Sequence, residues 1–342
     1  MPVSLDQLRR CSVAVDLGAA RTRIYLKGSG LVVDEPSVAA VNTRTGALLA
    51  VGETAEQMTG RTPEYIRVVR PVAGGTVVDI EMAQRMLRQL IGDKLRKAWR
   101  RNPRLRIAAC TPHDSEPLTR RASVETLSAL GARRVELANT LLCAAVGCGL
   151  PVEQPEATMI ALCGARTTQV AVLSLGAIVA ADTVPVGGHT IDRTVLEHLR
   201  NRHDLRLRCE STHPLPLVLT AAAETDERAE VVGRDVATGR ARTVTVETEE
   251  VRQAIRGPMT AVLDGIRGVL RRCPPDLVAD LSDRGIMLAG GTASLPGLRT
   301  MLARSTGMAV ETAEQPDTCA VRGLGAILEG RVRPVQLDSL TH

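Results

Sequence analysis

The sequence predicts an α/β protein made of two lobes of similar design, and two observations lead to that prediction. Apolar strand patterns alternate with amphipathic helical patterns along the whole chain of 342 residues. One motif also occurs twice, in Ser12–Leu26 and in Met159–Leu173, as an apolar strand, a small glycine-containing turn, a threonine and a second strand. A hairpin repeated about half a chain apart indicates duplicated lobes.

We place the first lobe at residues 1–155 and the second at residues 156–342, because the two hairpins begin near residues 12 and 159. Each lobe is expected to hold a core and a smaller subdomain. In lobe I the core is predicted at 12–30 and 76–155, with the subdomain at about 31–75. In lobe II the core is predicted at about 156–185 and 258–330, with the subdomain at about 186–257. The length suits two such units, and 44% of the residues are hydrophobic.

In lobe I the elements after the first hairpin follow helical and strand periodicity. The segment Glu81–Trp99 carries apolar residues at helical spacing, and Asp79 is suited to cap its N-terminus. Three further elements are expected: a buried strand at Arg106–Cys110, a helix at Leu118–Leu130 closed by Gly131, and an apolar helix at Ala138–Gly147.

In lobe II the second hairpin is followed by Gly187-Gly188 and a helical pattern over Ile191–Arg202. The pattern then predicts a strand at Val244–Glu247, a helix at Thr248–Arg271 that contains Pro258, a strand at Gly285–Leu288, a turn at Gly290-Gly291-Thr292 and a helix from Pro296.

Composition excludes several classes of protein. No run of about 20 apolar residues is present to span a membrane, and the N-terminus lacks the pattern of a signal peptide. The eight cysteines have no CxxC spacing, so we expect reduced thiols in a cytosolic protein. The six histidines show no metal-ligand spacing. The net charge of +5 is concentrated in seven basic residues between Lys94 and Arg106, which does not indicate nucleic-acid binding.

The two hairpins have the composition of phosphate-binding turns. Small residues leave backbone N–H groups exposed, and such a concavity holds a phosphate. Two turns facing each other across a cleft would grip a polyphosphate from both sides. The alternative is that both are tight turns with a purely geometric role.

Several longer segments resemble the MreB-type bacterial actins. DLGAARTRIYLKGSGLVVDEPSVAAV, the GRTP–RP segment before Gly75, AVGCGLP, VGGHTID and LAGGTASLPGL all carry the resemblance, which extends over about residues 12–330. It implies an actin-like fold of the sugar kinase and heat-shock ATPase superfamily, with ATP and Mg²⁺ in the cleft between the lobes. It also implies a head-to-tail homopolymer on the cytoplasmic face of the cell membrane, with cell-wall elongation or division proteins as partners.

The resemblance assigns a set of nucleotide-binding residues by position. Asp16 is the candidate for holding Mg²⁺ through a water, although an aspartate there can also cap its own turn. The matching positions are Asp16, Gly18, Gly164, Thr167, Thr168, Gly290, Gly291 and Ala293.

Other positions depart from the family pattern. In the first turn Ala19 replaces a threonine and Arg21 an asparagine. In the second turn Leu162 replaces an aspartate, and Arg166 either contacts phosphate or points to solvent. The family's paired glutamates, one of which orients the attacking water, fall at Asn139 and Thr140, and neither is a general base at neutral pH. Thr140 retains the ability to hydrogen-bond a water.

The adenosine side departs too. The family's glutamate and lysine belong to a helix that corresponds to Glu210–Leu219, where Pro214 and Pro216 preclude a regular helix. The segment has no lysine, and whether Glu210 corresponds to the family's glutamate stays open. We therefore assign no catalytic residue and expect hydrolysis to be lost and ATP binding to be weakened or absent.

The basic segment holds the chain's single tryptophan. Indole prefers the lipid headgroup region, and Lys and Arg are attracted to anionic lipid. The candidate membrane contacts are Lys94, Lys97, Trp99, Arg100 and Arg101, and the alternative is a solvated basic helix end.

The function predicted from these features is that of a membrane-associated cytoskeletal filament or scaffold that guides cell-wall synthesis and cell shape. Two alternatives remain: an active, ATP-driven filament, and a non-polymerising adaptor of the cell-wall or division machinery.

Overall fold

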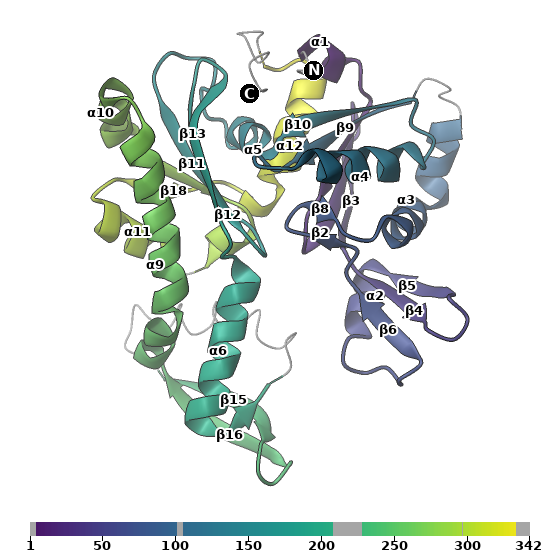
Figure 1. The fold of residues 1–342 in the computed structure, drawn as a ribbon, viewed down its shortest axis with the longest axis vertical. Coiled ribbons are helices and arrows are strands. Elements are labelled where there is room, and N and C mark those ends of the chain that lie inside the picture. The colour runs from purple at the N-terminus through teal and green to yellow at the C-terminus, as the bar shows by residue number, and fades with distance from the viewer. Residues whose placement is uncertain (1–4, 101–104, 208–227, 296, 333–342) are drawn as a thin grey trace.

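The computed structural model describes residues 5–100, 105–207, 228–295 and 297–332, and the side chains of residues 93–100 lie outside that description. Two five-stranded sheets form the centres of two lobes that lie side by side, with a smaller subdomain below each (Figure 1). The α/β, two-lobed architecture predicted from the repeated hairpin is confirmed.

The sheet of lobe I has the strand order β10-β9-β1-β2-β3. Strand β1 pairs antiparallel with β2 and parallel with β9, so the predicted hairpin lies at the middle of the sheet. Its strands are β1 (Val13–Leu17), β2 (Arg21–Leu26), β3 (Gly30–Pro36), β9 (Arg106–Thr111) and β10 (Arg134–Asn139).

The sheet of lobe II repeats this topology in the order β13-β12-β11-β17-β18. Strand β11 pairs antiparallel with β12 and parallel with β17, as β1 does with β2 and β9. The duplication therefore extends beyond the hairpins to whole sheets. These strands are β11 (Thr158–Cys163), β12 (Thr168–Ser174), β13 (Ala177–Val184), β17 (Ile286–Ala289) and β18 (Val310–Thr312).

Lobe I carries α3 (Ile80–Arg100) and α4 (Pro117–Ser128) on its sheet. Asp79 caps α3 as predicted, since its Oδ1 accepts the Met82 amide at 2.9 Å. The helix is not continuous, however, because Gly92 adopts φ 54° and interrupts the helical geometry, a conformation that glycine tolerates.

The small subdomain holds the sheet β5-β4-β6, and the remaining elements are α1 (Leu5–Arg9), β4 (Ala39–Asn42), β5 (Leu48–Val51), α2 (Gly52–Gln57), β6 (Ile66–Val69), β7 (Val72–Ala73) and β8 (Thr76–Val77).

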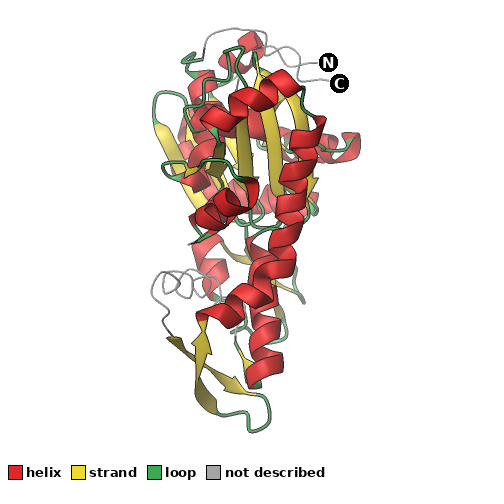
Figure 2. Ribbon diagram, turned by 90° about the vertical axis from the view of Figure 1, so that its left-hand side faces the viewer, coloured by secondary structure: helices red, strands yellow, loops and turns green. Residues whose placement is uncertain are grey.

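Lobe II carries its helices on the outer face of the sheet, and two of them run down to the small subdomain (Figure 2). These two are α6 (Gly188–His203) and α9 (Thr248–Arg272), and α9 continues through Pro258. The small sheet β14-β15-β16 joins their lower ends. The other elements are β14 (Leu205–Arg206), β15 (Arg228–Asp235), β16 (Ala241–Glu247), α10 (Pro275–Arg284), the 3₁₀ turns η2 (Gly291–Ser294) and η3 (Pro316–Thr318), and α11 (Leu298–Thr306).

Two helices pack against each other between the lobes: α5 (Thr140–Gly147) and α12 (Cys319–Leu328) (Figure 1). Their backbones touch through glycines, because a Cβ at Gly323 would lie 1.7 Å from the carbonyl oxygen of Cys143. Residues 319–328 are predicted to belong to lobe II, but α12 packs on β1, β2 and β9 of lobe I. The two helices share one apolar core with both sheets.

One predicted element begins later than expected. Ala138 and Asn139 end β10 rather than starting the helix, because they pair with Cys110 and Thr111 of β9. The helical pattern over 138–147 therefore includes the last residues of a strand that the sequence analysis missed.

None of the helices among the described residues has both the length and the apolar character needed to cross a membrane.

Candidate functional site

The first hairpin turn is held in shape by the segment that follows it. The Gly18 amide donates to the Arg21 carbonyl at 3.0 Å, and a Cβ at Gly18 would lie 2.6 Å from that oxygen. Ser37 Oγ donates to the Gly18 carbonyl at 2.7 Å and lies 2.8 Å from Thr22 Oγ1. Among the described residues, no acceptor bonds the backbone amides of Ala19 and Ala20. These are the groups that a phosphate needs.

The second turn has the same backbone closure. The Gly164 amide donates to the Thr167 carbonyl at 2.9 Å, and the Gly164 carbonyl accepts the Gly188 amide at 3.1 Å. The Thr168 hydroxyl is buried and donates to the Val186 carbonyl at 2.8 Å, so it is engaged within the lobe. The amides of Ala165 and Arg166 have no acceptor within the described part of the chain.

The Gly290-Gly291 turn lies directly against the second hairpin. Gly290 has φ 86°, and a Cβ there would lie 2.3 Å from the Cys163 carbonyl oxygen. Thr292 Oγ1 donates to the Gly164 carbonyl at 2.9 Å. Ala293 is only 3% exposed within the lobe II core, so its methyl group does not reach the cleft and only its backbone is available.

Asp16, the candidate magnesium residue, lies on β1 opposite Arg23 of β2. Within the described residues its carboxylate makes no hydrogen bond and no ion pair. Burial raises the pKa of Asp16, while the nearby Arg23 guanidinium lowers it and the Asp34 carboxylate raises it further. The carboxylate is thus poorly compensated, as is common for residues kept for a functional purpose.

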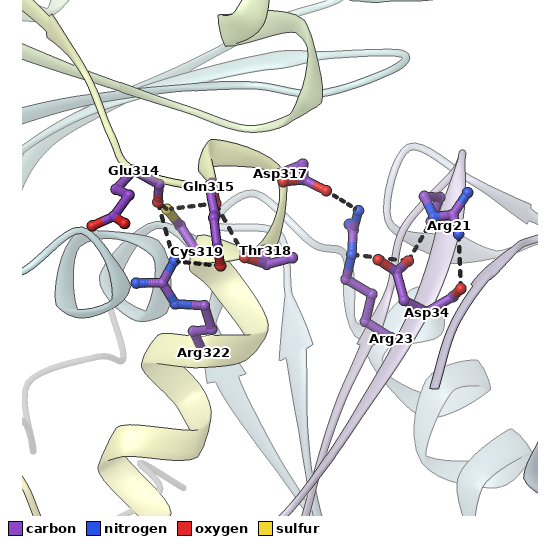
Figure 3. Close-up of polar contacts among 9 residues, drawn as sticks. All are labelled: Arg21, Arg23, Asp34, Glu314, Gln315, Asp317, Thr318, Cys319 and Arg322. Carbon is purple, nitrogen blue, oxygen red and sulfur yellow. Dashed lines mark hydrogen bonds and ion pairs between the residues drawn. The ribbon is translucent and has the colours of Figure 1, made fainter. Parts of the chain in front are cut away.

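An ion-pair network that the sequence analysis missed joins the first hairpin to lobe II (Figure 3). Arg23, whose side chain is 9% exposed, places Nη2 2.8 Å from Asp317 Oδ2 and Nε 3.2 Å from Asp34 Oδ1. Arg21 donates from Nη2 to the Asp34 carbonyl at 2.7 Å. Arg21, which stands where the resemblance places an asparagine, therefore contacts Asp34 of β3, within the sheet of its own lobe.

The second turn offers different side chains. Leu162 pairs with Gln169 of β12 and Ala289 of β17 and packs against the interlobe core. Arg166 is exposed and has no ion pair among the described residues. A leucine in this place supplies no oxygen to order a hydrated cation.

Asn139, which the resemblance aligns with one of the family's glutamates, has a structural role here. Asn139 Oδ1 accepts the Leu141 amide at 2.9 Å and so caps α5. Its Nδ2 lies 3.0 Å from His113 Nδ1, and the His113 amide donates to Gln169 Oε1 at 3.4 Å across the lobes. An amide engaged in this way does not act as a base.

A cavity of about 170 Å³ opens between the lobes beside this position. Thr167 is the one member of the predicted nucleotide set among its lining residues. Asp114 and Glu116 place carboxylates on its lobe I side, which disfavours an anionic ligand at this end. The full lining is Gly74, Thr76, Pro112, Asp114, Ser115, Glu116, Thr119, Thr167, Gln169 and Thr183.

The residues present fit a phosphate better than they fit Mg²⁺ and an attacking water. Both turns present amides without acceptors among the described residues. Of the positions assigned to the cation, Asp16 alone is a carboxylate, and the guanidinium of Arg23 lies beside it. The structure brings Gly164, Gly290 and Gly291 together at the second hairpin, while Asp16 and Gly18 lie on the first.

Two predicted regions fall at least partly outside the described residues. Glu210–Leu219, with Pro214 and Pro216, lies wholly outside, as does Arg101. Lys94, Lys97, Trp99 and Arg100 belong to the last part of α3, where side chains are not described.

The sequence spacing of the histidines predicts no metal site, but the fold brings together a group of side chains that could hold a metal ion. His198, His203 and Glu250 place ligand atoms within 4.8 Å of one another. Sequence spacing did not reveal the group, because its members belong to α6 and α9 and meet only in the folded chain.

Fold and site together define a class: an actin-like protein with two duplicated sheets around a cleft. MreB 5 of Spiroplasma citri bound to AMPPNP superimposes with a TM-score of 0.86 at 25% identity, over 91% of this chain and 93% of that one. The same protein bound to ADP gives a TM-score of 0.85. MamK in a double helical filament gives 0.75 at 19% identity, over 94% and 99% of the two chains, which supports the fold alone.

The family follows from sequence. The model of the MreB/Mbl protein family matches residues 10–335. The chain is 36% identical over 323 residues to the cell shape-determining protein MreB of Escherichia coli (strain K12), covering 93% of each. It is 34% identical over 320 residues to the cell shape-determining protein Mbl of Bacillus subtilis (strain 168), covering 93% of this chain and 95% of that protein. The chain belongs to the MreB/Mbl family.

Proposed function

We propose that this chain is a cytoskeletal protein that forms filaments or scaffolds guiding cell-wall synthesis and cell shape, with impaired ATP hydrolysis. Its relatives in Escherichia coli and Bacillus subtilis are cell shape-determining proteins, and 93% of the chain takes part in each match. The observation that carries the second half of the proposal is the use of Asn139 as the cap of α5 where the family orients water.

For nucleotide binding, the backbone of the two turns and the side chains around them favour opposite conclusions. The relative from Spiroplasma citri was crystallised with AMPPNP and with ADP. Here both phosphate turns keep their backbone closure. Leu162 removes one cation-binding position, and Asp16 has a raised pKa beside Arg23. We infer weak ATP·Mg²⁺ binding through backbone amides and no productive hydrolysis.

The test is sedimentation of the purified full chain with ATP, with ADP and without nucleotide, together with phosphate release. We expect polymer in all three conditions and phosphate release no greater than that of an Asp16→Ala variant. ATP-dependent polymer with steady phosphate release would instead establish the active filament. The absence of polymer in every condition would favour the non-polymerising adaptor.

Membrane placement is a separate part of the proposal. It rests on the sequence of the basic segment, in which Trp99 stands among seven basic residues between Lys94 and Arg106. An apolar wedge and a polybasic patch together give stable but reversible anchoring. We propose the anionic inner face of the cell membrane as the surface that this segment contacts, and cell-wall elongation or division proteins as the partners there.

Vesicle co-sedimentation tests this placement. The protein should bind anionic vesicles and release as salt rises, because the attraction is screened within about 8–10 Å at physiological ionic strength. Trp99→Ala should weaken binding even at low salt, and Arg100→Glu with Arg101→Glu should weaken it mainly on anionic lipid. Trp99 is the only tryptophan, so its emission should shift to the blue on binding. An unmoved emission with unchanged sedimentation of the variants would remove the segment as the membrane contact.

A further inference from the structure

Three potential metal ligands converge at the base of the small subdomain of lobe II. His198 and His203 come from the C-terminal part of α6, and Glu250 comes from the first turn of α9. His203 Nε2 lies 2.8 Å from Glu250 Oε2, and His198 Nε2 lies 3.6 Å from the same oxygen. All three side chains are partly buried, with exposed fractions of 25%, 18% and 24% for His198, His203 and Glu250.

One atom of this group lacks a partner. His198 Nε2 is buried and has no hydrogen bond among the described residues. Its 3.6 Å separation from Glu250 Oε2 is too long for a hydrogen bond. Buried polar atoms are nearly always satisfied, so an unsatisfied imidazole nitrogen calls for a missing ligand. A cation placed among the three side chains would supply it.

The donor types select the kind of cation. Two imidazole nitrogens with one carboxylate oxygen suit zinc and neighbouring transition metals, whereas Mg²⁺ and Ca²⁺ prefer oxygen donors alone. Around a tetrahedral zinc with bonds near 2.0–2.1 Å, ligand atoms lie roughly 3.3 Å apart. The separations of 2.8 and 3.6 Å lie on either side of that value. Three protein ligands would leave a fourth position for water.

The surrounding charges do not oppose a cation. The Glu250 carboxylate, whose Oε2 lies 2.8 Å from His203 Nε2, gives the group a negatively charged ligand. Arg242, which donates to the His203 carbonyl at 3.4 Å, is paired with Asp235 at 3.0 Å. Arg252, one turn along α9, is paired with Glu249 at 3.5 Å.

We propose that His198, His203 and Glu250 form a zinc-class metal site that clamps the end of α6 to the start of α9. Helix α6 leads into β14, and α9 begins where β16 ends. The site therefore lies where the chain both enters and leaves the small sheet β14-β15-β16. A bound metal fixes the orientation of this subdomain relative to the lobe II core.

The experiment uses the full chain, free of metal and without a polyhistidine tag, titrated with Co²⁺ and then with Zn²⁺. We expect one equivalent of Co²⁺ to give the visible absorption bands of a tetrahedral site and Zn²⁺ to abolish them. His198→Ala, His203→Ala and Glu250→Gln should each weaken binding at least about 100-fold, since loss of even an outer-shell partner costs 10- to 100-fold. The matched control is Glu249→Gln, the adjacent glutamate, which should bind as the parent does.

A second measurement separates metal binding from folding. Zn²⁺ should raise the thermal midpoint of the parent and of Glu249→Gln but not that of the three ligand variants, and circular dichroism should show that all are folded before titration. Binding should weaken as the solution is acidified, because protons compete with the metal for the imidazole nitrogens. Failure of the folded parent to bind Co²⁺ and Zn²⁺, or equal binding by Glu250→Gln, would overturn the proposal.

Discussion

The turn at Gly18 and the turn at Gly164 are built alike, yet they present different chemistry to the cleft. In both, the glycine amide donates to the carbonyl three residues further on, at 3.0 and 2.9 Å. The first turn keeps the carboxylate of Asp16 and adds Arg23, which reaches Asp317 at 2.8 Å. The second turn has Leu162 packed into the interlobe core and an exposed Arg166. The two turns share their backbone geometry but not their arrangement of charges.

The difference shows which part of such a site the fold itself requires. The second hairpin is bonded to its own lobe through Gly164, Thr168 and Gly290, so its shape is needed for packing whether or not a nucleotide is bound. The first hairpin is bonded across the cleft by an ion pair between side chains. Changes at the second hairpin should therefore affect stability most, and changes at the first should affect the relation between the lobes.

The largest effect is expected at Gly290, which supports the second hairpin. In Gly290→Ala the new Cβ would lie 2.3 Å from the Cys163 carbonyl at a φ of 86°, so the backbone must shift. We expect the free energy of unfolding to fall by about 4 kcal/mol, a loss of the size that strained backbone positions cause. The midpoint of urea unfolding measures this loss.

Gly291→Ala is its matched control. A Cβ at that neighbouring position would meet only Asp317 Cβ, at 4.0 Å, so the midpoint should move by less than about 1 kcal/mol. Equal losses in the two variants would show that the contact with Cys163 is not what holds the second hairpin.

A smaller effect is expected from removal of the ion pair that ties the first hairpin to lobe II. Arg23→Met leaves Asp317 without this partner, and Arg23 is buried while Asp317 is 43% exposed. We expect about 1–2 kcal/mol of destabilisation, between the values for surface and buried pairs.

Arg21→Met provides the comparison, because Arg21 contacts Asp34 within its own lobe. A double-mutant cycle of Arg23→Met with Asp317→Asn should show the larger coupling, and the cycle of Arg21→Met with Asp317→Asn a smaller one, because Arg21 is linked to Asp317 only through Asp34 and Arg23. Coupling in neither cycle would mean that the ion pair does not join the lobes in solution.

The sequence predicted the hairpins and the cap at Asp79, because each follows from a short local pattern, and the repetition of the hairpin predicted the duplicated lobes. It missed β10, since the apolar run through Ala138 has no sign of where strand gives way to helix. The pair Arg23–Asp317 was beyond reach, as it joins residues 294 positions apart. The group His198, His203 and Glu250 was missed for the same reason, because its members meet only when α6 packs on α9.

The next effect is one of stabilisation, at Asp16. Its folded-state pKa is raised by burial, so the folded protein binds a proton more readily than the unfolded chain does, and ionisation at neutral pH costs stability. Asp16→Asn should therefore raise the thermal midpoint at pH 7 by about 1–3 °C. Leu162→Asn, at the second hairpin, should lower it, because it places an amide in a position packed with apolar side chains. A lower midpoint for Asp16→Asn would show that the carboxylate is compensated.

The smallest effect concerns His113, which connects Asn139 of lobe I with Gln169 of the second hairpin. Desolvation lowers the pKa of His113, Asp114 opposes that shift and Arg120 adds to it. The contact with Asn139 also favours the neutral ring. The side-chain NH₂ group of Asn139 can only donate, so His113 Nδ1 must accept and cannot carry a proton. In the unfolded chain the imidazole titrates near its usual pKa of about 6.5. Below that pH the unfolded state binds the proton first, so stability falls as pH decreases from about 6.5 towards the lowered folded-state pKa.

His113→Gln removes this contribution, and the difference in thermal midpoint between parent and variant should therefore change between pH 7.5 and pH 5.5. If the parent and His113→Gln show parallel pH profiles, His113 does not connect the two sides of the cleft through a neutral ring.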